Sequence, residues 1–255
     1  MFIDTHAHIY SKEFVDDFEA MLLRSSEAGV SNIYMPNIDT MSIERMMEIA
    51  TNHSNCHAMM GLHPCHVKVD YMTELAIIEK YLYDDKIVGI GEIGIDLYWD
   101  KTFYHEQEDA FRRQISMAKS AGLPFVIHSR DSLDLTIDIV SGMQDGSLKG
   151  IFHCFNGSKI QAQKIIDIGF LMGIGGVITY KNAGVDIVVA DIPIEYLVLE
   201  TDAPYLSPVP YRGKRNECAY IKEIAYKLAQ LKQCPLSQID AQTTINANNL
   251  FGNTP

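Results

Sequence analysis

Six side chains of the kinds that bind divalent metals follow short apolar runs in this chain: His6, His8, Glu92, His128, His153 and Asp202. Imidazole and carboxylate groups together form the mixed ligand set that suits Zn, Mn, Fe, Co or Ni. Six ligands are enough for two cations, and two cations about 3.5–4 Å apart can generate hydroxide and hold both oxygens of a displacement. These residue types predict a metal-dependent hydrolase if the fold brings them together.

The first two histidines are spaced for joint binding. His6 and His8 are two residues apart, so on an extended chain both imidazoles face the same side. A lone His-x-His pair arises about as often from chance or core packing, so its weight here comes from the other ligands. Asp4 lies on the same face, where it could orient a ligating imidazole or only cap the strand end.

The other candidate ligands carry different weights. Glu92 is surrounded by glycine and isoleucine, and a buried acid is costly unless it is paired or bound to metal. His128 and His153 singly are typical of hydrogen-bonded core histidines, but at equivalent places on neighbouring strands they indicate a second cation. Asp202 could bind metal and also accept a proton from metal-bound water.

Eight strand-like runs alternate with helix-like segments. We expect strands over residues 1–5, 32–36, 57–61, 87–91, 124–127, 150–152, 170–173 and 196–199. Apolar spacing predicts helices around 14–22 and 43–50, and over 73–83, 104–120, 133–142, 159–168, 217–231 and 236–251. An open doubly wound sheet fits nearly as well. A (β/α)8 TIM barrel is favoured because the ligands follow strands one, four, five, six and eight, whose carboxyl ends would meet at one rim. His63, which ends the third strand, would line the same mouth.

Bulk composition sets limits on the class of protein. The 255 residues, 47% hydrophobic and 21% charged, suit one domain over residues 1–255, with segment 236–251 covering the barrel wall. No window of about 18 apolar residues and no leader sequence is present, which predicts a cytoplasmic protein. The five cysteines form no C-x-x-C pair and predict reduced thiols. A net charge of −12 argues against a broad basic surface for duplex DNA.

Seven ordered motifs carry a family resemblance that spans essentially the whole chain. In sequence order they are Phe2-Ile3-Asp4-Thr5-His6-Ala7-His8, Gly61-Leu62-His63-Pro64, Gly91-Glu92-Ile93-Gly94-Ile95-Asp96, Pro124-Phe125-Val126-Ile127-His128-Ser129-Arg130, Phe152-His153-Cys154-Phe155, Leu199-Glu200-Thr201-Asp202-Ala203-Pro204-Tyr205-Leu206 and Arg212-Gly213-Lys214-Arg215-Asn216-Glu217. The chain resembles the TatD family of metal-dependent deoxyribonucleases, within the amidohydrolase-type barrels.

The resemblance implies a TIM barrel with two divalent cations, for which Zn, Mn, Mg, Ni and Co are candidates. It implies hydrolysis of phosphodiester bonds in DNA, often as a 3′-to-5′ exonuclease, with Asp202 activating the attacking water. The substrate partner would be DNA or another phosphodiester, with no membrane and no obligatory protein partner. The implied roles are His6, His8 and Asp202 on one cation, His128 and His153 on the other, Glu92 bridging both, and His63, Arg212 and Asn216 at the substrate phosphate.

This chain departs from the family pattern at two positions. The family usually has Gly-x-His-Pro-His, but Cys65 follows Pro64 here, so one pocket histidine is missing or replaced by His66. Cys218 stands where the family has proline after Asn-Glu. Glu92 also separates the chain from relatives that bridge their metals with a carboxylated lysine.

The loops leave two alternatives open. Arg212 and Arg215 could form a solvated turn or a phosphate site, and late loops of this barrel often bind phosphate. Trp99, Tyr205 and Tyr211 could stack on bases or simply pack.

Two other functions compete with phosphodiester hydrolysis. Metal-hydroxide attack on an amide, a lactone or another small ester uses the same parts, and a fold does not fix a function. A non-enzymatic metal-binding scaffold is the remote alternative, because all six ligands are present.

Overall fold

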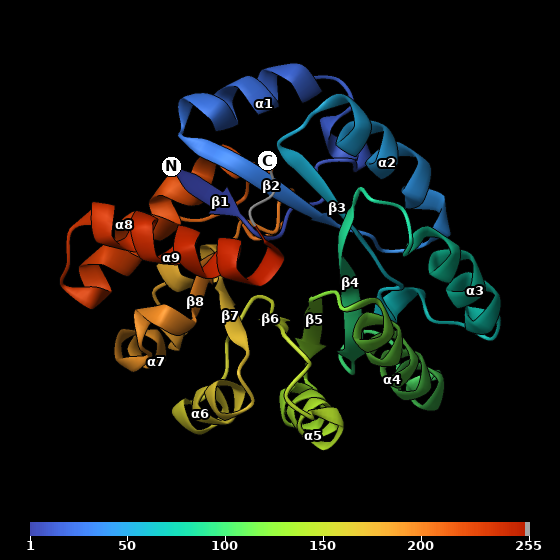
Figure 1. The fold of residues 1–255 in the computed structure, drawn as a ribbon. Helices are drawn as coiled ribbons and strands as arrows, with labels where there is room; N and C mark the ends of the chain where they lie inside the picture. Colours follow the sequence, from blue (N-terminus) through green and yellow to red (C-terminus); the bar gives the residue numbers. More distant parts are fainter. Residues whose placement is uncertain (253–255) are drawn as a thin grey trace.

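A computed structural model describes residues 1–252, in which eight parallel strands form one sheet in the order β1 to β8. Figure 1 shows the helices around the outside of these strands. The strands are β1 (Phe2–Asp4), β2 (Val30–Pro36), β3 (Cys56–Met60), β4 (Ile87–Asp96), β5 (Phe125–Arg130), β6 (Gly150–Phe152), β7 (Leu171–Ile174) and β8 (Leu197–Leu199). The predicted barrel and all eight of its strands are therefore confirmed, and the open doubly wound sheet is wrong.

The helices follow the predicted alternation with one addition. They are α1 (Phe18–Glu27), α2 (Ile43–Asn52), α3 (Tyr71–Tyr81), α4 (Tyr104–Ala121), α5 (Leu133–Met143), α6 (Lys159–Asp167), α7 (Val185–Asp191), α8 (Ile221–Lys232) and α9 (Leu236–Phe251). Helix α7 was not predicted, because seven residues give too short an apolar pattern. Among residues 1–252, no helix combines the length and apolar character needed to span a bilayer.

Strands β4 and β5 run further than predicted. Pairing continues from Ile93 opposite Ile127 to Asp96 opposite Arg130, so Glu92 and His128 lie within strands rather than after them. A register shift between Ile90 and Ile93 places Glu92 at an irregularity in the ladder. The sequence pattern missed this extension because glycines interrupt the apolar run.

One of these glycines is required for the extension. Gly94 has φ of +148°, and a Cβ atom there would collide with the carbonyl oxygen of His128. Glycine alone allows β4 and β5 to approach this closely, since it lacks Cβ and tolerates positive φ. The local sequence around Glu92 therefore fixes the position of His128 on the neighbouring strand.

The interior of the barrel is filled by an apolar layer that combines residues of the strands with residues of α9. Ile3, Tyr34, Met59 and Val126 belong to one buried cluster that includes Phe251 at the end of α9. The rings of Tyr34 and Phe251 stack with centroids 4.0 Å apart. The expectation that segment 236–251 only covers the outer wall is thus incomplete, because its last turn packs against the residues that fill the barrel.

The barrel closes where β1 and β8 continue past their last residues. Thr5 donates its amide hydrogen to Leu199 O (3.0 Å), Asp202 donates to His6 O (2.9 Å), and His8 donates to Ala203 O (2.7 Å). Three of the six predicted ligands, His6, His8 and Asp202, therefore lie on the closing seam.

Asp4 holds this seam together. Its fully buried carboxylate accepts hydrogen bonds from the amide of Thr201 (2.9 Å) and from the Thr201 hydroxyl (2.6 Å). It also accepts from the amide of His6 (3.3 Å), but no hydrogen bond joins it to an imidazole among residues 1–252. Of the two roles considered for Asp4, strand capping is the one that the structure supports.

Replacing Asp4 by alanine would leave the buried Thr201 groups without an acceptor. We expect Asp4→Ala to lower the free energy of unfolding by about 2–4 kcal/mol, because unsatisfied buried polar groups carry their full desolvation cost. Urea unfolding in excess chelator measures this without a contribution from metal binding. Asp240→Ala is the matched control, since Asp240 pairs with the largely exposed amino group of Met1 and should lose less than about 1 kcal/mol. Equal losses for the two variants would contradict the role of Asp4.

Candidate metal centre

The first group of ligand atoms gathers at the β1–β8 seam around one oxygen of Glu92. His6 Nε2 lies 3.2 Å from His8 Nε2 and 3.2 Å from Glu92 Oε2. His8 Nε2 lies 3.5 Å from the same oxygen. Asp202 Oδ1 lies 3.8 Å from His6 Nε2 and 3.6 Å from His8 Nε2. Four donor atoms from β1, β4 and the end of β8 therefore face a common point.

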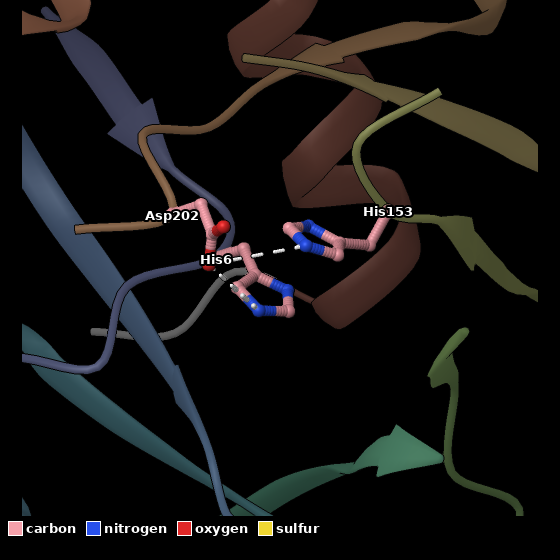
Figure 2. A group of neighbouring side chains, drawn as sticks. All are labelled: His6, His153 and Asp202. Atoms are coloured by element: carbon pink, nitrogen blue, oxygen red, sulfur yellow. Dashed lines mark ion pairs between the residues drawn. The ribbon is translucent and has the colours of Figure 1, made fainter. Parts of the chain in front are cut away.

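The second group gathers around the other oxygen of Glu92. His128 Nδ1 lies 2.8 Å from Glu92 Oε1, and His153 Nε2 lies 4.0 Å from it. His153 also reaches toward the first group, with its Nε2 3.9 Å from Asp202 Oδ1. Figure 2 shows His153 and His6 approaching Asp202 from different strands. The structure thus brings all six predicted ligands together, and each oxygen of Glu92 faces one group.

The separations in the first group suit a cation. Bonds of about 2.1 Å to a tetrahedral metal place neighbouring donor atoms about 3.4 Å apart. The five separations of the first group run from 3.2 to 3.8 Å. Among residues 1–252, His6 Nδ1 is buried without a hydrogen-bond partner, and the His6 ring stacks on that of His153 with centroids 3.5 Å apart. The residues therefore fit a bound divalent metal.

The charges in the centre follow from burial and proximity. Burial raises the pKa of the Glu92 carboxyl, but His63 and the other imidazoles outweigh it and hold this pKa well below its usual value. The pKa of Asp202 is lowered in the same way against the effect of burial, first by His8. Both carboxylates are therefore ionised at neutral pH. Protons shared with the imidazoles would be released on metal uptake.

Three of the histidines predicted to bind metal contact another side chain through their second ring nitrogen. Tyr10 Oη lies 2.9 Å from His8 Nδ1 and donates its own hydrogen to Pro36 O. Asp96 Oδ2 lies 2.9 Å from His128 Nε2. Such contacts fix the ring orientation and the tautomer of a metal-binding imidazole.

Glu200 supports His153 in the same way. Its Oε1 lies 2.9 Å from His153 Nδ1, at ion-pair distance but outside hydrogen-bond alignment, and accepts from the amide of Cys154 at 2.7 Å. Burial lowers the pKa of His153, but the charge of Glu200 outweighs it and raises this pKa to about 9. Gly173 makes room for Glu200, because a Cβ atom there would collide with the carboxylate.

These supporting residues differ in how far the sequence could reveal them. Tyr10 continues the two-residue spacing of His6 and His8, a signal that was present but not used. Asp96 follows Gly94 in the sequence, where an aspartate could begin a turn. It has two roles in the structure, because Oδ1 accepts from the amides of Tyr98 and Trp99 while Oδ2 faces His128. The sequence gives no separate signal for Glu200.

The structure places His63 inside the second group of donors. Its Nε2 lies 3.2 Å from His128 Nδ1 and 3.6 Å from Glu92 Oε1, distances like those between the predicted ligands. Its Nδ1 accepts from the amide of Cys65. Burial lowers the pKa of His63 to about 4, so this imidazole is neutral at pH 7. His63 faces the predicted second cation as closely as it would face a substrate.

The loop after β8 separates its predicted phosphate contacts. Arg212 is exposed, and its guanidinium lies over the ring of Tyr180 at 3.9 Å. Asn216 is fully buried, and its amide donates to Thr201 O (2.7 Å) and Tyr205 O (2.6 Å). A direct substrate contact of Asn216 is wrong for this conformation, because its polar atoms are already used to hold the backbone near Asp202.

Two further residues of this loop, Arg215 and Tyr211, pack against other parts of the protein, whereas the ring of Tyr205 lies 6.0 Å from that of His8. Arg215 donates to both oxygens of Asp17 (2.6 and 2.8 Å), which joins the loop to the start of α1. Tyr211 stacks on Tyr220 with centroids 3.9 Å apart. Of the open alternatives, Arg215 and Tyr211 are therefore structural, while Arg212 remains available to a ligand.

The position that departs from the family pattern lies beside Asp96. Burial raises the pKa of the Cys65 thiol to about 12 and Asp96 adds to the shift, so the thiol is protonated at neutral pH. His66 Nδ1 lies 3.0 Å from Asp39 Oδ2, and this ion pair occupies His66 away from the donor atoms of the centre. His66 thus does not restore the missing pocket histidine.

A barrel that gathers imidazoles and carboxylates at the carboxyl ends of its strands defines a metal-dependent hydrolase. The family described as TatD related DNase matches residues 3–252, and the chain belongs to this family. It is 38% identical to the metal-dependent hydrolase YabD of Bacillus subtilis, over 98% of this chain and 99% of that protein. It is 29% identical to the 3′-5′ ssDNA/RNA exonuclease TatD of Klebsiella pneumoniae, over 98% and 97%. The crystal structure of the TatD homologue YjjV of Escherichia coli superposes with a TM-score of 0.93 at 31% identity, over 98% and 97%.

Glu200 can lie beside His153 only because Gly173 has no side chain, so this glycine should affect metal affinity. We expect Gly173→Ala to displace Glu200 from His153 and to weaken metal binding about 10- to 100-fold, the usual effect of losing such a support. Competition with a chromogenic chelator measures the affinity. Glu200→Gln, which keeps the volume, should weaken binding in the same direction.

Gly142→Ala is the control, because nothing lies within 4 Å of the added atom there. Folded Gly173→Ala and Glu200→Gln proteins with the affinity of the wild type would show that Glu200 does not support a ligand.

The ion pairs of the loop after β8 predict a pH dependence of stability. Hydrogen bonds from Arg215 and Arg24 hold the pKa of Asp17 below its usual value. A carboxyl group with a lowered native pKa stabilises the fold above its unfolded pKa of about 3.9, and the contribution is lost as the pH falls toward the native pKa. The urea midpoint of the wild type should therefore exceed that of Asp17→Asn near neutral pH, with a difference that shrinks below about pH 4. A difference independent of pH would contradict this assignment.

Proposed function

We propose that residues 1–255 act as a single domain that hydrolyses phosphodiester bonds of DNA with two divalent cations. This proposal rests on the contacts of the two carboxylate oxygens of Glu92. Its Oε2 faces His6 and His8, while its Oε1 faces His128. One buried carboxylate shared between two donor groups is the arrangement expected of a bridging ligand. His153 and Asp202 would complete the set.

When bound, two such cations supply a polarised phosphoryl oxygen and a hydroxide nucleophile at neutral pH. Asp202 is the acceptor for the proton of the attacking water, because its carboxylate is buried, ionised and shared by three imidazoles. The imidazoles and Glu92 hold the reacting groups in place. A mixed nitrogen and oxygen ligand set favours Zn, Mn, Ni or Co, and Mg remains a candidate.

The substrate phosphate would be held by an exposed cation beside the centre. Arg212 has no carboxylate partner among residues 1–252, so its charge is available to a phosphate. His63 is neutral, so it would not attract the phosphate by charge. It would instead contact the cation that binds the phosphate. Asn216 would act indirectly, by holding the loop that carries Tyr205.

The mode of cleavage is proposed by analogy with the Klebsiella pneumoniae relative, a 3′-5′ exonuclease of single-stranded DNA and RNA. The net charge of −12 argues against a duplex more strongly than against such a substrate, because a short single strand needs fewer basic contacts. No further protein partner is required by this chemistry, and we propose that the enzyme works in the cytoplasm.

Asp202→Asn tests the proposal directly. We expect this variant to lose at least about 100-fold in the rate of nucleotide release from labelled single-stranded DNA, because its amide cannot accept the proton. Elemental analysis of the same preparation should find divalent metal in the wild type, and a chelator should abolish hydrolysis. Asp240→Asn, at a partly exposed carboxylate that pairs with the amino group of Met1, should keep the wild-type rate.

The same preparation also distinguishes the alternative chemistries. Unchanged release by Asp202→Asn would remove the proposed base. Cleavage of an amide or lactone panel by metal-loaded protein, with no cleavage of any phosphodiester, would overturn the substrate class while leaving a metal-dependent hydrolase.

A further inference from the structure

Two aromatic residues stand exposed on the rim where β4 ends. The relative exposure of Tyr98 is 52% and that of Trp99 is 68%, and their rings meet edge to face with centroids 5.0 Å apart. Trp99 is the only tryptophan in the chain. Large aromatic rings of this kind normally bury most of their surface, so a paired and exposed set marks a surface that binds something.

The backbone of this pair is tied to the metal centre by Asp96. Its Oδ1 accepts hydrogen bonds from the amides of Tyr98 (2.9 Å) and Trp99 (3.0 Å), while its Oδ2 lies 2.9 Å from His128 Nε2. His128 in turn lies 2.8 Å from Glu92. A single carboxylate therefore separates the aromatic pair from a ligand histidine, and the pair is fixed relative to the reacting groups.

A cation completes this surface. The guanidinium of Arg130, at the end of β5, lies 3.9 Å from the ring centroid of Tyr98 and 5.5 Å from that of Trp99. Arg130 is exposed, and among residues 1–252 it makes no ion pair with a carboxylate. The surface thus combines two exposed aromatic rings with a positive charge that lies over one face of Tyr98 and leaves Trp99 more open, on a protein whose net charge is −12.

We propose that Tyr98, Trp99 and Arg130 form a subsite for a nucleotide of single-stranded nucleic acid, with the base stacked on the aromatic pair and the backbone phosphate near Arg130. The proposal rests on phosphodiester hydrolysis at the adjacent centre and adds how the substrate strand is held there. Stacking on aromatic rings with arginine support is a common and sequence-tolerant way to bind single strands. A duplex would not fit this mode, because its bases are already stacked on one another.

The single tryptophan allows a binding measurement that does not depend on catalysis. Trp99 fluorescence in the Asp202→Asn protein should be quenched saturably by a ten-nucleotide oligothymidylate, because a stacked base lies against the indole. An abasic oligonucleotide of the same length should not quench it. Arg130→Gln should weaken the binding of oligothymidylate at least about 5-fold, since base and phosphate are held together.

Kinetics with two substrates separate this subsite from the chemistry. Trp99→Ala should raise the KM for single-stranded DNA about 5- to 100-fold, the range for loss of one stacked base. Its hydrolysis of bis(p-nitrophenyl) phosphate, which has no base, should stay at the wild-type rate. The substitution keeps the Trp99 amide that bonds to Asp96, so the support of His128 is retained. Tyr83→Ala, at a more exposed aromatic residue that precedes β4 rather than following it, should leave the hydrolysis of both substrates unchanged.

The outcomes distinguish the two proposals. Saturable quenching by oligothymidylate without hydrolysis of either phosphodiester would support the subsite and overturn the proposed reaction. Equal quenching by the abasic strand, or an unchanged KM for DNA in Trp99→Ala, would overturn the subsite while leaving the reaction in place. Equal loss of both substrates in Trp99→Ala would also overturn it, because the ring would then act on the metal centre rather than on the base.

Discussion

The burial of one carboxylate, Glu92, is the constraint on which this structure depends. An ionised acid inside a barrel is unfavourable by several kcal/mol unless surrounding groups compensate for its lost hydration. Here the compensation comes from four imidazoles that belong to separate segments of the chain: His6 after β1, His63 after β3, His128 in β5 and His153 after β6. Each oxygen of the carboxylate meets a different set. The same arrangement that stabilises the ionised acid also gathers imidazole and carboxylate atoms that could hold a metal ion.

Placing that carboxylate requires backbone features that a regular barrel would lack. Glu92 lies at a register shift between β4 and β5, and its amide donates to Asn37 O on the other side at 2.8 Å. Gly94 then lets the two strands come together again beside His128. On the opposite side the closing seam carries His6 and Asp202, and Asp4 holds it. The apolar layer below, with the end of α9 packed against it, gives these elements a rigid base.

The carboxylates Asp96 and Glu200 extend this order outward. Each touches a ligand histidine on one side and backbone amides on the other. Because of this double role, the loops that follow β4 and β6 are fixed relative to the ligands. A rim built in this way can present substrate-binding groups at defined positions, although loops are ordinarily the most variable part of a barrel.

The sequence by itself determined the class of fold and which side chains with metal-binding chemistry meet at its rim. Apolar runs of the right length and number indicate eight strands, and metal-binding side chains after them indicate a shared rim. Both signals are local, so they can be recognised in the sequence alone. The ends of the strands were less well determined. Strands β4 and β5 extend further because they pair with each other, and local composition does not show this pairing. The directions of the Asn216 and His63 side chains were not determined, because both depend on which way a side chain turns after the backbone has folded: Asn216 bonds to the backbone near Asp202, and His63 lies beside Glu92.

Only the tertiary structure decided how the ligands are divided and what supports them. Which oxygen of Glu92 faces which histidine depends on the register between strands that are far apart in sequence, and so does the contact of Glu200 with His153. The pairing of Arg215 with Asp17, 198 positions away, also cannot be recognised from the sequence. Because of this pairing, Arg215 is not free to bind a phosphate, as the sequence alone would allow. The sequence gives the chemical type of each side chain, whereas tertiary packing decides which other side chains it contacts.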